Sequence, residues 1–98
     1  MSESLQLFTI RRQINTDNYQ LSGIQQNRLD AKEELTEILN AYGQDSPQYK
    51  EAMAQAATLD AELEQEQNVL QLDIQQLTAW AESLQEGIEK SNERIFGA

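Results

Sequence analysis

The sequence has neither cysteine nor histidine among its 98 residues. Disulfide bonds, thiolate nucleophiles, imidazole bases and the usual ligands of zinc are therefore excluded. The sequence also has no glycine-rich phosphate-binding loop and no nucleophile with a partner base. These absences predict a protein that is not an enzyme, has no small-molecule substrate and holds no cofactor or metal ion.

Positive charge is scarce: seven lysine and arginine residues stand against 17 aspartate and glutamate residues, which gives a net charge of −10. Nucleic acids and anionic membranes are not expected partners, because both are bound by clustered positive charge. No apolar run approaches the roughly 20 residues of a membrane span. The first four residues resemble no cleavable signal peptide, so we expect the protein in the cytoplasm or exported without such a signal.

What the chain does have is an apolar stripe through residues 7–42, with alternating spacings of three and four residues. This spacing is typical of a helix that buries one narrow seam against another helix. The stripe consists of Leu7, Ile10, Ile14, Asp17, Leu21, Ile24, Arg28, Ala31, Leu35, Ile38 and Tyr42.

The residues between this stripe and the rest of the chain predict a tight turn. Gly43 suits the position just past a helix end, Ser46 suits a helix N-cap and Pro47 suits the first helical turn. The sequence therefore predicts a single domain, residues 1–98, with a helix over 3–42, a turn over 43–46 and a helix over 47–95. The predicted fold is all-α: an antiparallel two-helix hairpin or coiled coil that assembles into a larger helical bundle or filament.

The second helix is expected to present a matching seam. Residues that face each other across the hairpin should have numbers that add up to about 91, so that Leu35 faces Ala56 and Ile14 faces Leu77. Beyond Leu63 the apolar spacing predicts a four-residue insertion in the heptad pattern. The predicted seam is Met53, Ala56, Leu59, Leu63, Glu66, Leu70, Ile74, Leu77, Ala81, Leu84, Ile88, Ser91 and Ile95.

Two charged residues interrupt the first stripe. Arg28 is expected to pack its stem in the seam and to reach a glutamate at residue 62, 64 or 66, which would fix the register of the helices. Asp17 is expected at a solvated edge or in contact with another chain. Four carboxylates that fall within twelve residues of the second helix are expected to lie on a solvated face, since side chains two residues apart do not converge on a helix; they are Glu62, Glu64, Glu66 and Asp73.

Two segments resemble the subunits of type III secretion needles, which are short helical hairpins without cysteine. Residues 45–49, Asp-Ser-Pro-Gln-Tyr, resemble the turn of those subunits, and residues 86–96 resemble their isoleucine-rich ending. The resemblance implies a self-assembling component of a secretion apparatus. A lesser resemblance is to the WXG-type secreted hairpin proteins, because residues 41–43, Ala-Tyr-Gly, lie where those proteins have a Trp-x-Gly turn.

The end of the second helix is the expected interaction element. Pairing about the turn leaves residues 88–98 without a partner on the first helix, and the apolar surface is widest around Trp80. The predicted function is a structural or assembly protein that binds copies of itself; the alternative is a small acidic chaperone or adaptor that binds a basic or helical protein. The predicted protein-interaction residues are Trp80, Ile88, Lys90, Arg94, Ile95 and Phe96.

Overall fold

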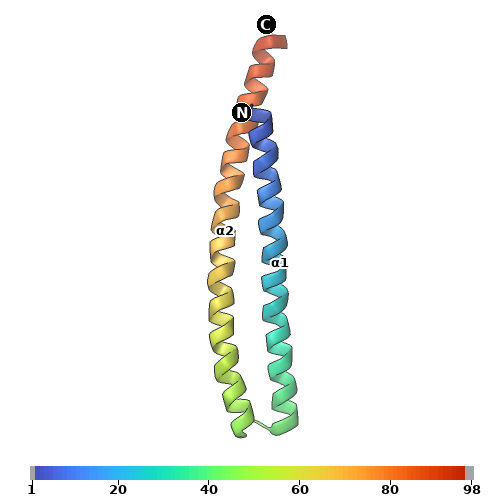
Figure 1. Cartoon of the computed structure of the whole chain (residues 1–98), viewed down its shortest axis with the longest axis vertical. Coiled ribbons are helices and arrows are strands. Elements are labelled where there is room, and N and C mark those ends of the chain that lie inside the picture. Colours follow the sequence, from blue (N-terminus) through green and yellow to red (C-terminus); the bar gives the residue numbers. More distant parts are fainter. Residues whose placement is uncertain (1, 97–98) are drawn as a thin grey trace. The chain divides into compact units, whose positions relative to one another are not determined.

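The structure, a computed structural model, describes the backbone of residues 2–96 and the side chains of residues 2–92. It consists of helix α1 (Glu3–Tyr42) and helix α2 (Pro47–Phe96), joined by one short turn (Figure 1). No strand occurs among the described residues. The predicted all-α hairpin of two antiparallel helices is thereby confirmed. Neither helix has, within its described residues, an apolar stretch long enough to cross a membrane.

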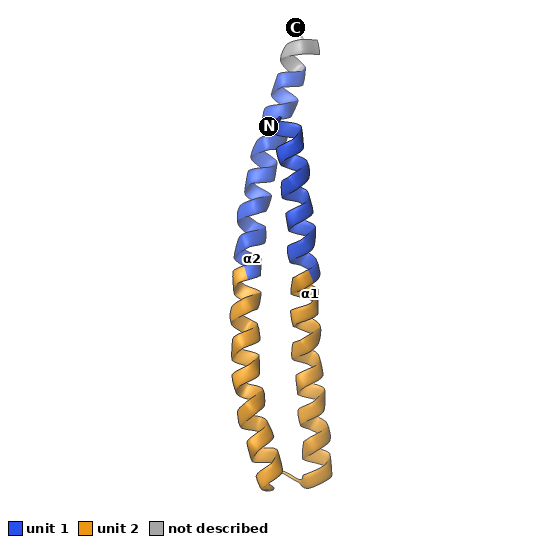
Figure 2. Ribbon diagram, viewed as in Figure 1, with its two compact units in different colours: residues 1–19, 70–98 blue, residues 20–69 orange. Residues whose placement is uncertain are grey.

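The hairpin divides into two compact units, each of which pairs a segment of α1 with a segment of α2 (Figure 2). Unit 1 comprises Met1–Tyr19 and Leu70–Ala98. Unit 2 comprises Gln20–Val69 and contains the turn. Each unit therefore joins chain segments that lie on opposite sides of the turn in the sequence.

Serine side chains cap the start of both helices. The backbone N–H of Leu5 donates to Ser2 Oγ at 3.1 Å at the start of α1. The N–H of Tyr49 donates to Ser46 Oγ, also at 3.1 Å, at the start of α2. Each hydroxyl satisfies one of the N–H groups that the first helical turn leaves without a partner. These caps fix where the chain enters each helix.

Gly43 ends α1 in a conformation that other residues rarely adopt. Its φ is 91°, and its N–H donates to the carbonyl oxygen of Leu39 at 2.8 Å. A residue in the left-handed region at this position closes the last turn of a helix. The carbonyl of Gly43 also accepts the hydroxyl of Ser46 at 2.8 Å, which links the end of α1 to the cap of α2.

Two glycine substitutions are expected to have opposite effects on stability. Gly43→Ala should lower the free energy of unfolding by about 1–2 kcal/mol, because a Cβ is strained at positive φ. Gly23→Ala should raise it by about 0.5–1 kcal/mol, because Gly23 lies inside α1 and a Cβ there would meet no atom within 4 Å. Urea unfolding followed by circular dichroism measures both; equal effects of the two variants would contradict the structure of the turn.

The stripe predicted for α1 is the buried seam of that helix. Every stripe position from Leu7 to Ile38 is buried or half-buried, and Tyr42 at the helix end is exposed. Burial is deepest in unit 1, where Leu7, Ile10 and Asp17 are each at most 5% exposed. The spacing of three and four residues was therefore sufficient to identify the contact face of α1.

The seam predicted for α2 is wrong in the first half of that helix and again at Ser91, which is exposed. Met53, Leu59 and Glu66 are exposed, whereas Asp60 and Gln67 are half-buried. With these two polar residues included, the spacing beyond Leu63 continues without an insertion, so the interruption of the heptads predicted there is also wrong. Near the turn Tyr49 and Ala52 are half-buried. From there on the observed seam positions are Ala56, Asp60, Leu63, Gln67, Leu70, Ile74, Leu77, Ala81, Leu84 and Ile88.

Candidate interaction surface

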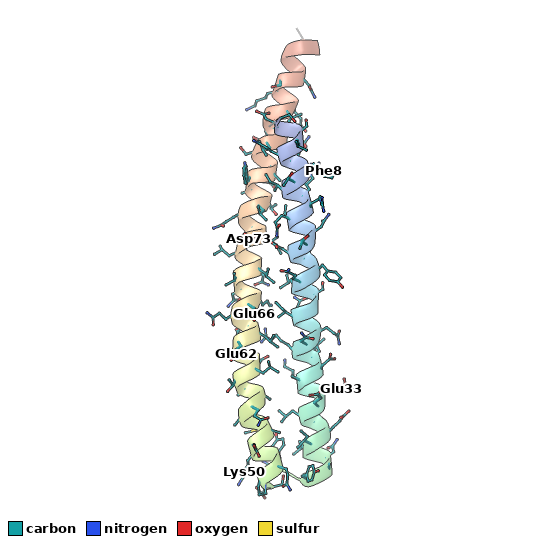
Figure 3. The ribbon with its side chains drawn as sticks, in the orientation of Figure 1. Phe8, Glu33, Lys50, Glu62, Glu66 and Asp73 are labelled. Carbon is teal, nitrogen blue, oxygen red and sulfur yellow. The ribbon has the colours of Figure 1, made fainter. Side chains whose placement is uncertain are left out.

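Unit 1 exposes large apolar side chains on both of its helices. On α1, Phe8 is 59% exposed and Tyr19 is 82% exposed. The two are eleven residues apart, about three helical turns, so they share the side of α1 opposite its seam. Phe8 points away from α2 (Figure 3). On α2, Leu72 and Trp80 are each more than half exposed.

Unit 2 is loosely packed near the turn. Small alanines at seam positions leave a hollow of about 160 Å³ between the helices. Its apolar lining residues are Ala31, Leu35, Ile38, Ala52, Ala56 and Leu59. Unit 2 also exposes several large apolar side chains, namely Leu29, Tyr42, Met53, Leu59 and Val69.

The predicted interaction residues fall into three groups. Trp80 is 53% exposed and Lys90 is exposed, so both are available on the surface of unit 1. Ile88 is half-buried, which contradicts the expectation that it lies on an uncovered helix end. The side chains of the remaining three, Arg94, Ile95 and Phe96, lie outside the described residues.

The position of the start of α1 explains why Ile88 is half-buried whereas residues 89–92 are exposed. A Cβ on Gly87 would lie 3.4 Å from Glu3 Oε2, so the first residue of α1 is beside Gly87. Helix α2 continues past this point to Phe96 (Figure 1). The predicted unpaired end of α2 is therefore present in the backbone, and it begins after Ile88. This end of the helix, from residue 89 onward, is called the overhang.

Arg28 forms the one ion pair among the described residues, with Asp60 in unit 2. Its Nε donates to Asp60 Oδ1 at 2.8 Å and a second guanidinium nitrogen donates to Oδ2 at 3.1 Å. The third nitrogen donates to Gln67 Oε1 at 2.9 Å. The hydrogen bonds that Arg28 donates to Asp60 lower the pKa of Asp60 and raise the pKa of Arg28. The expected partners at residues 62, 64 and 66 are therefore wrong.

Asp17 lies in the seam of unit 1 and is only 3% exposed. Its Oδ1 accepts a hydrogen bond from Gln13 Nε2 at 2.8 Å, but its buried Oδ2 has no donor in the described structure. Asp73 of α2 approaches it: the pKa of Asp73 is raised, first by a hydrogen bond with Asp17, then by burial and by the charge of Asp17. The expectation of a solvated edge for Asp17 is wrong, and so is the solvated position expected for Asp73, which is half-buried.

Sequence reasoning missed three of the residues that form these polar contacts: Asp60, Gln67 and Asp73. A strict spacing of three and four residues, continued in both directions from Leu63, would have identified Asp60 and Gln67 as seam positions. The described part of the chain has no group of three or more acidic side chains placed to hold a metal ion. No protein-family model, curated protein or solved structure matches this chain.

Proposed function

We propose that the protein is a structural or assembly component that associates with copies of itself through the side chains its hairpin leaves uncovered. The observation that supports this is the small core. Among the described residues only three apolar side chains are buried, namely Leu7, Ile10 and Leu63. In the same part of the chain, ten large apolar side chains are exposed. Burying apolar surface is favourable by about 25 cal/mol per Å², so a further helix packed on this surface would stabilise the hairpin.

The overhang of α2 favours a repeating assembly. Lys90 is exposed on it, while residues 51–89 of the same helix contain nine acidic residues and no lysine or arginine. Lys90 of one copy could thus pair with a carboxylate on the acidic side of the next copy. Such a contact between unlike surfaces builds a ring or a filament. The resemblance to secretion needle subunits makes a filament of a secretion apparatus the most specific form of this proposal.

The second candidate is a small acidic chaperone or adaptor, and the uncompensated charge supports it. The net charge is −10, and Arg28 with Asp60 is the one ion pair that the described residues form. Carboxylates without a cation would attract a basic protein and repel other copies of this chain. In that case the partner would stabilise the hairpin through the linkage of binding to folding.

Light scattering on the pure protein separates the two candidates. For the assembly protein we expect a mass well above the 11.2 kDa of one chain. Replacing Leu72 and Trp80 together by aspartate should return the mass to that of the monomer while helical circular dichroism is retained. The matched control is Gln76→Asp, an exposed position on the same helix that adds charge without removing apolar surface. A wild-type protein that stays monomeric and is stabilised by an added basic protein would instead support the adaptor.

Deletion of residues 89–98 tests the overhang separately. If the overhang is the element that docks on the next copy, the truncated chain should be monomeric and still helical. If the truncated chain associates as before while the Leu72 and Trp80 variant does not, the exposed side chains of unit 1 are sufficient for assembly.

A further inference from the structure

The buried oxygen of Asp17 is a polar atom that the hairpin leaves without a donor. Asp17 occupies a seam position, and the Oδ2 atom is buried without a hydrogen-bond partner in the described structure. A buried carboxylate oxygen without a donor is costly, because it has given up the hydrogen bonds of water. Some group must therefore supply a proton or a positive charge to this oxygen when unit 1 is closed.

Among the described residues, no cation forms an ion pair with Asp17 or Asp73. On α1 the nearest cations are Arg11, which donates to Gln85, and Arg12, which is exposed. On α2 no lysine or arginine occurs anywhere between residues 51 and 89. The acidic residues nearest to Asp73 along α2 are Glu66 and Glu82, both exposed, and the one charge that shifts the pKa of Asp73 is that of Asp17.

A metal ion is a poor match for the site. Calcium takes six to eight oxygen ligands and magnesium keeps several waters in an octahedral shell. The two carboxyl groups offer few oxygens, and Asp17 Oδ2 is buried from solvent. A proton needs no such space. A carboxyl group of Asp73 that carries a proton donates its O–H to Asp17 Oδ2 and satisfies both side chains.

We propose that Asp17 and Asp73 form a proton-binding site in unit 1, in which a proton held by the carboxyl group of Asp73 is donated in a hydrogen bond to Asp17 Oδ2 and strengthens the pairing of α1 with α2 at acidic pH. Two carboxylates in contact cannot both be ionised without repulsion, so the pair retains a proton that separate aspartates would lose. The site is independent of the function proposed above, because it acts on the folding of unit 1 and not on association.

The direction of the pH dependence follows from the raised pKa of Asp73. Above about pH 4, the ordinary pKa of aspartate, the unfolded chain releases this proton while the folded chain still holds it. The stabilisation is therefore complete below about pH 4, where both chains hold the proton. It is lost as the pH rises through the raised value. The contribution of Asp60 in unit 2 to the stability of the fold has the opposite pH dependence. Because the pKa of Asp60 is lowered, this contribution is present above the ordinary pKa of aspartate and is lost as the pH falls.

The test compares the urea midpoint of the full chain with that of Asp73→Asn between about pH 5 and about pH 8. Asparagine is nearly isosteric and its amide donates to Asp17 Oδ2 at every pH. We expect Asp73→Asn to have a higher midpoint than the wild type at the alkaline end, and the difference to shrink as the pH falls. The control is Glu66→Gln, which removes the same charge from an exposed position one heptad earlier on α2.

Three outcomes would overturn the proposal. One is a pH profile for Asp73→Asn that coincides with that of Glu66→Gln, which would mean that only the net charge matters. A second is a carboxyl ¹³C titration of the wild type in which Asp73 ionises at its ordinary pKa. This second measurement uses the unmodified protein, so it decides the matter even if the variant fails to fold. A midpoint at neutral pH that rises on addition of magnesium or calcium would likewise replace the proton by a metal ion.

Discussion

Replacing Ile10 by alanine is expected to lower the free energy of unfolding by about 2–4 kcal/mol. Ile10 is 4% exposed and is one of the few buried apolar side chains of the hairpin. The register of the seam places it opposite Ala81, so the substitution would leave one small side chain facing another across unit 1. A two-helix seam has no second layer that could move in to fill the space. Because small domains are only marginally stable, we expect a loss of this size to unfold much of the protein at room temperature.

Phe8→Ala is the matched control for this substitution. Phe8 is only two residues away on the same helix, but it is 59% exposed and points away from α2 (Figure 3). In an isolated hairpin its loss should change stability by less than about 0.5 kcal/mol. Thermal and urea unfolding of both variants at low protein concentration would measure the difference. If Phe8→Ala costs as much as Ile10→Ala, and more so at high concentration, then another chain covers this side of α1.

Arg28→Leu is expected to lower the urea midpoint of the hairpin. From the sequence alone, an apolar residue at this seam position would be expected to leave the free energy of unfolding unchanged or to raise it. The structure changes that expectation, because Asp60 would keep its half-buried charge and lose the two hydrogen bonds that Arg28 donates to it. The expected loss is smaller than for Ile10→Ala, since both partners are partly exposed to water.

The double variant Arg28→Leu with Asp60→Leu shows whether the loss comes from the unpaired carboxylate. With both charges removed, two apolar side chains would occupy the seam, and we expect a midpoint equal to or above that of the wild type. The non-additivity of the two substitutions in a double-mutant cycle then measures the coupling of the pair. A double variant less stable than Arg28→Leu alone would show that the ion pair holds the register of unit 2.

The sequence was sufficient to predict α1, the turn and the antiparallel pairing, because each is encoded by a local pattern. It was not sufficient for the first half of α2. There the apolar residues Met53 and Leu59 suggested one face, whereas the helices meet on the face that carries Asp60 and Gln67. Arg28 accounts for the difference: its guanidinium provides hydrogen bonds that make two polar residues acceptable in the seam.

The contact of Asp17 with Asp73 could not be predicted for a different reason. The register gives their proximity, since their numbers add up to about 91. Two acidic residues are nevertheless expected to avoid each other because their charges repel, and a sequence does not record the protonation state of a side chain. Of the predicted interaction residues, Trp80 and Lys90 are on the described surface, and Arg94, Ile95 and Phe96 stay predictions.

The single turn also sets the order in which the hairpin can close. Contacts of unit 2 join residues near each other in the chain, as with Arg28 and Asp60, which are 32 residues apart, whereas Arg11 and Gln85 of unit 1 are 74 apart. Because loop-closure entropy grows as about (3/2)RT ln n, direct closure of the longer loop costs about 0.7 kcal/mol more. If unit 2 has already closed, its paired helices shorten the loop that remains. During synthesis, moreover, the first helical turns of α1 leave the ribosome before their partners on α2 have been made. Their apolar side chains therefore remain exposed to water until the end of α2 is synthesised.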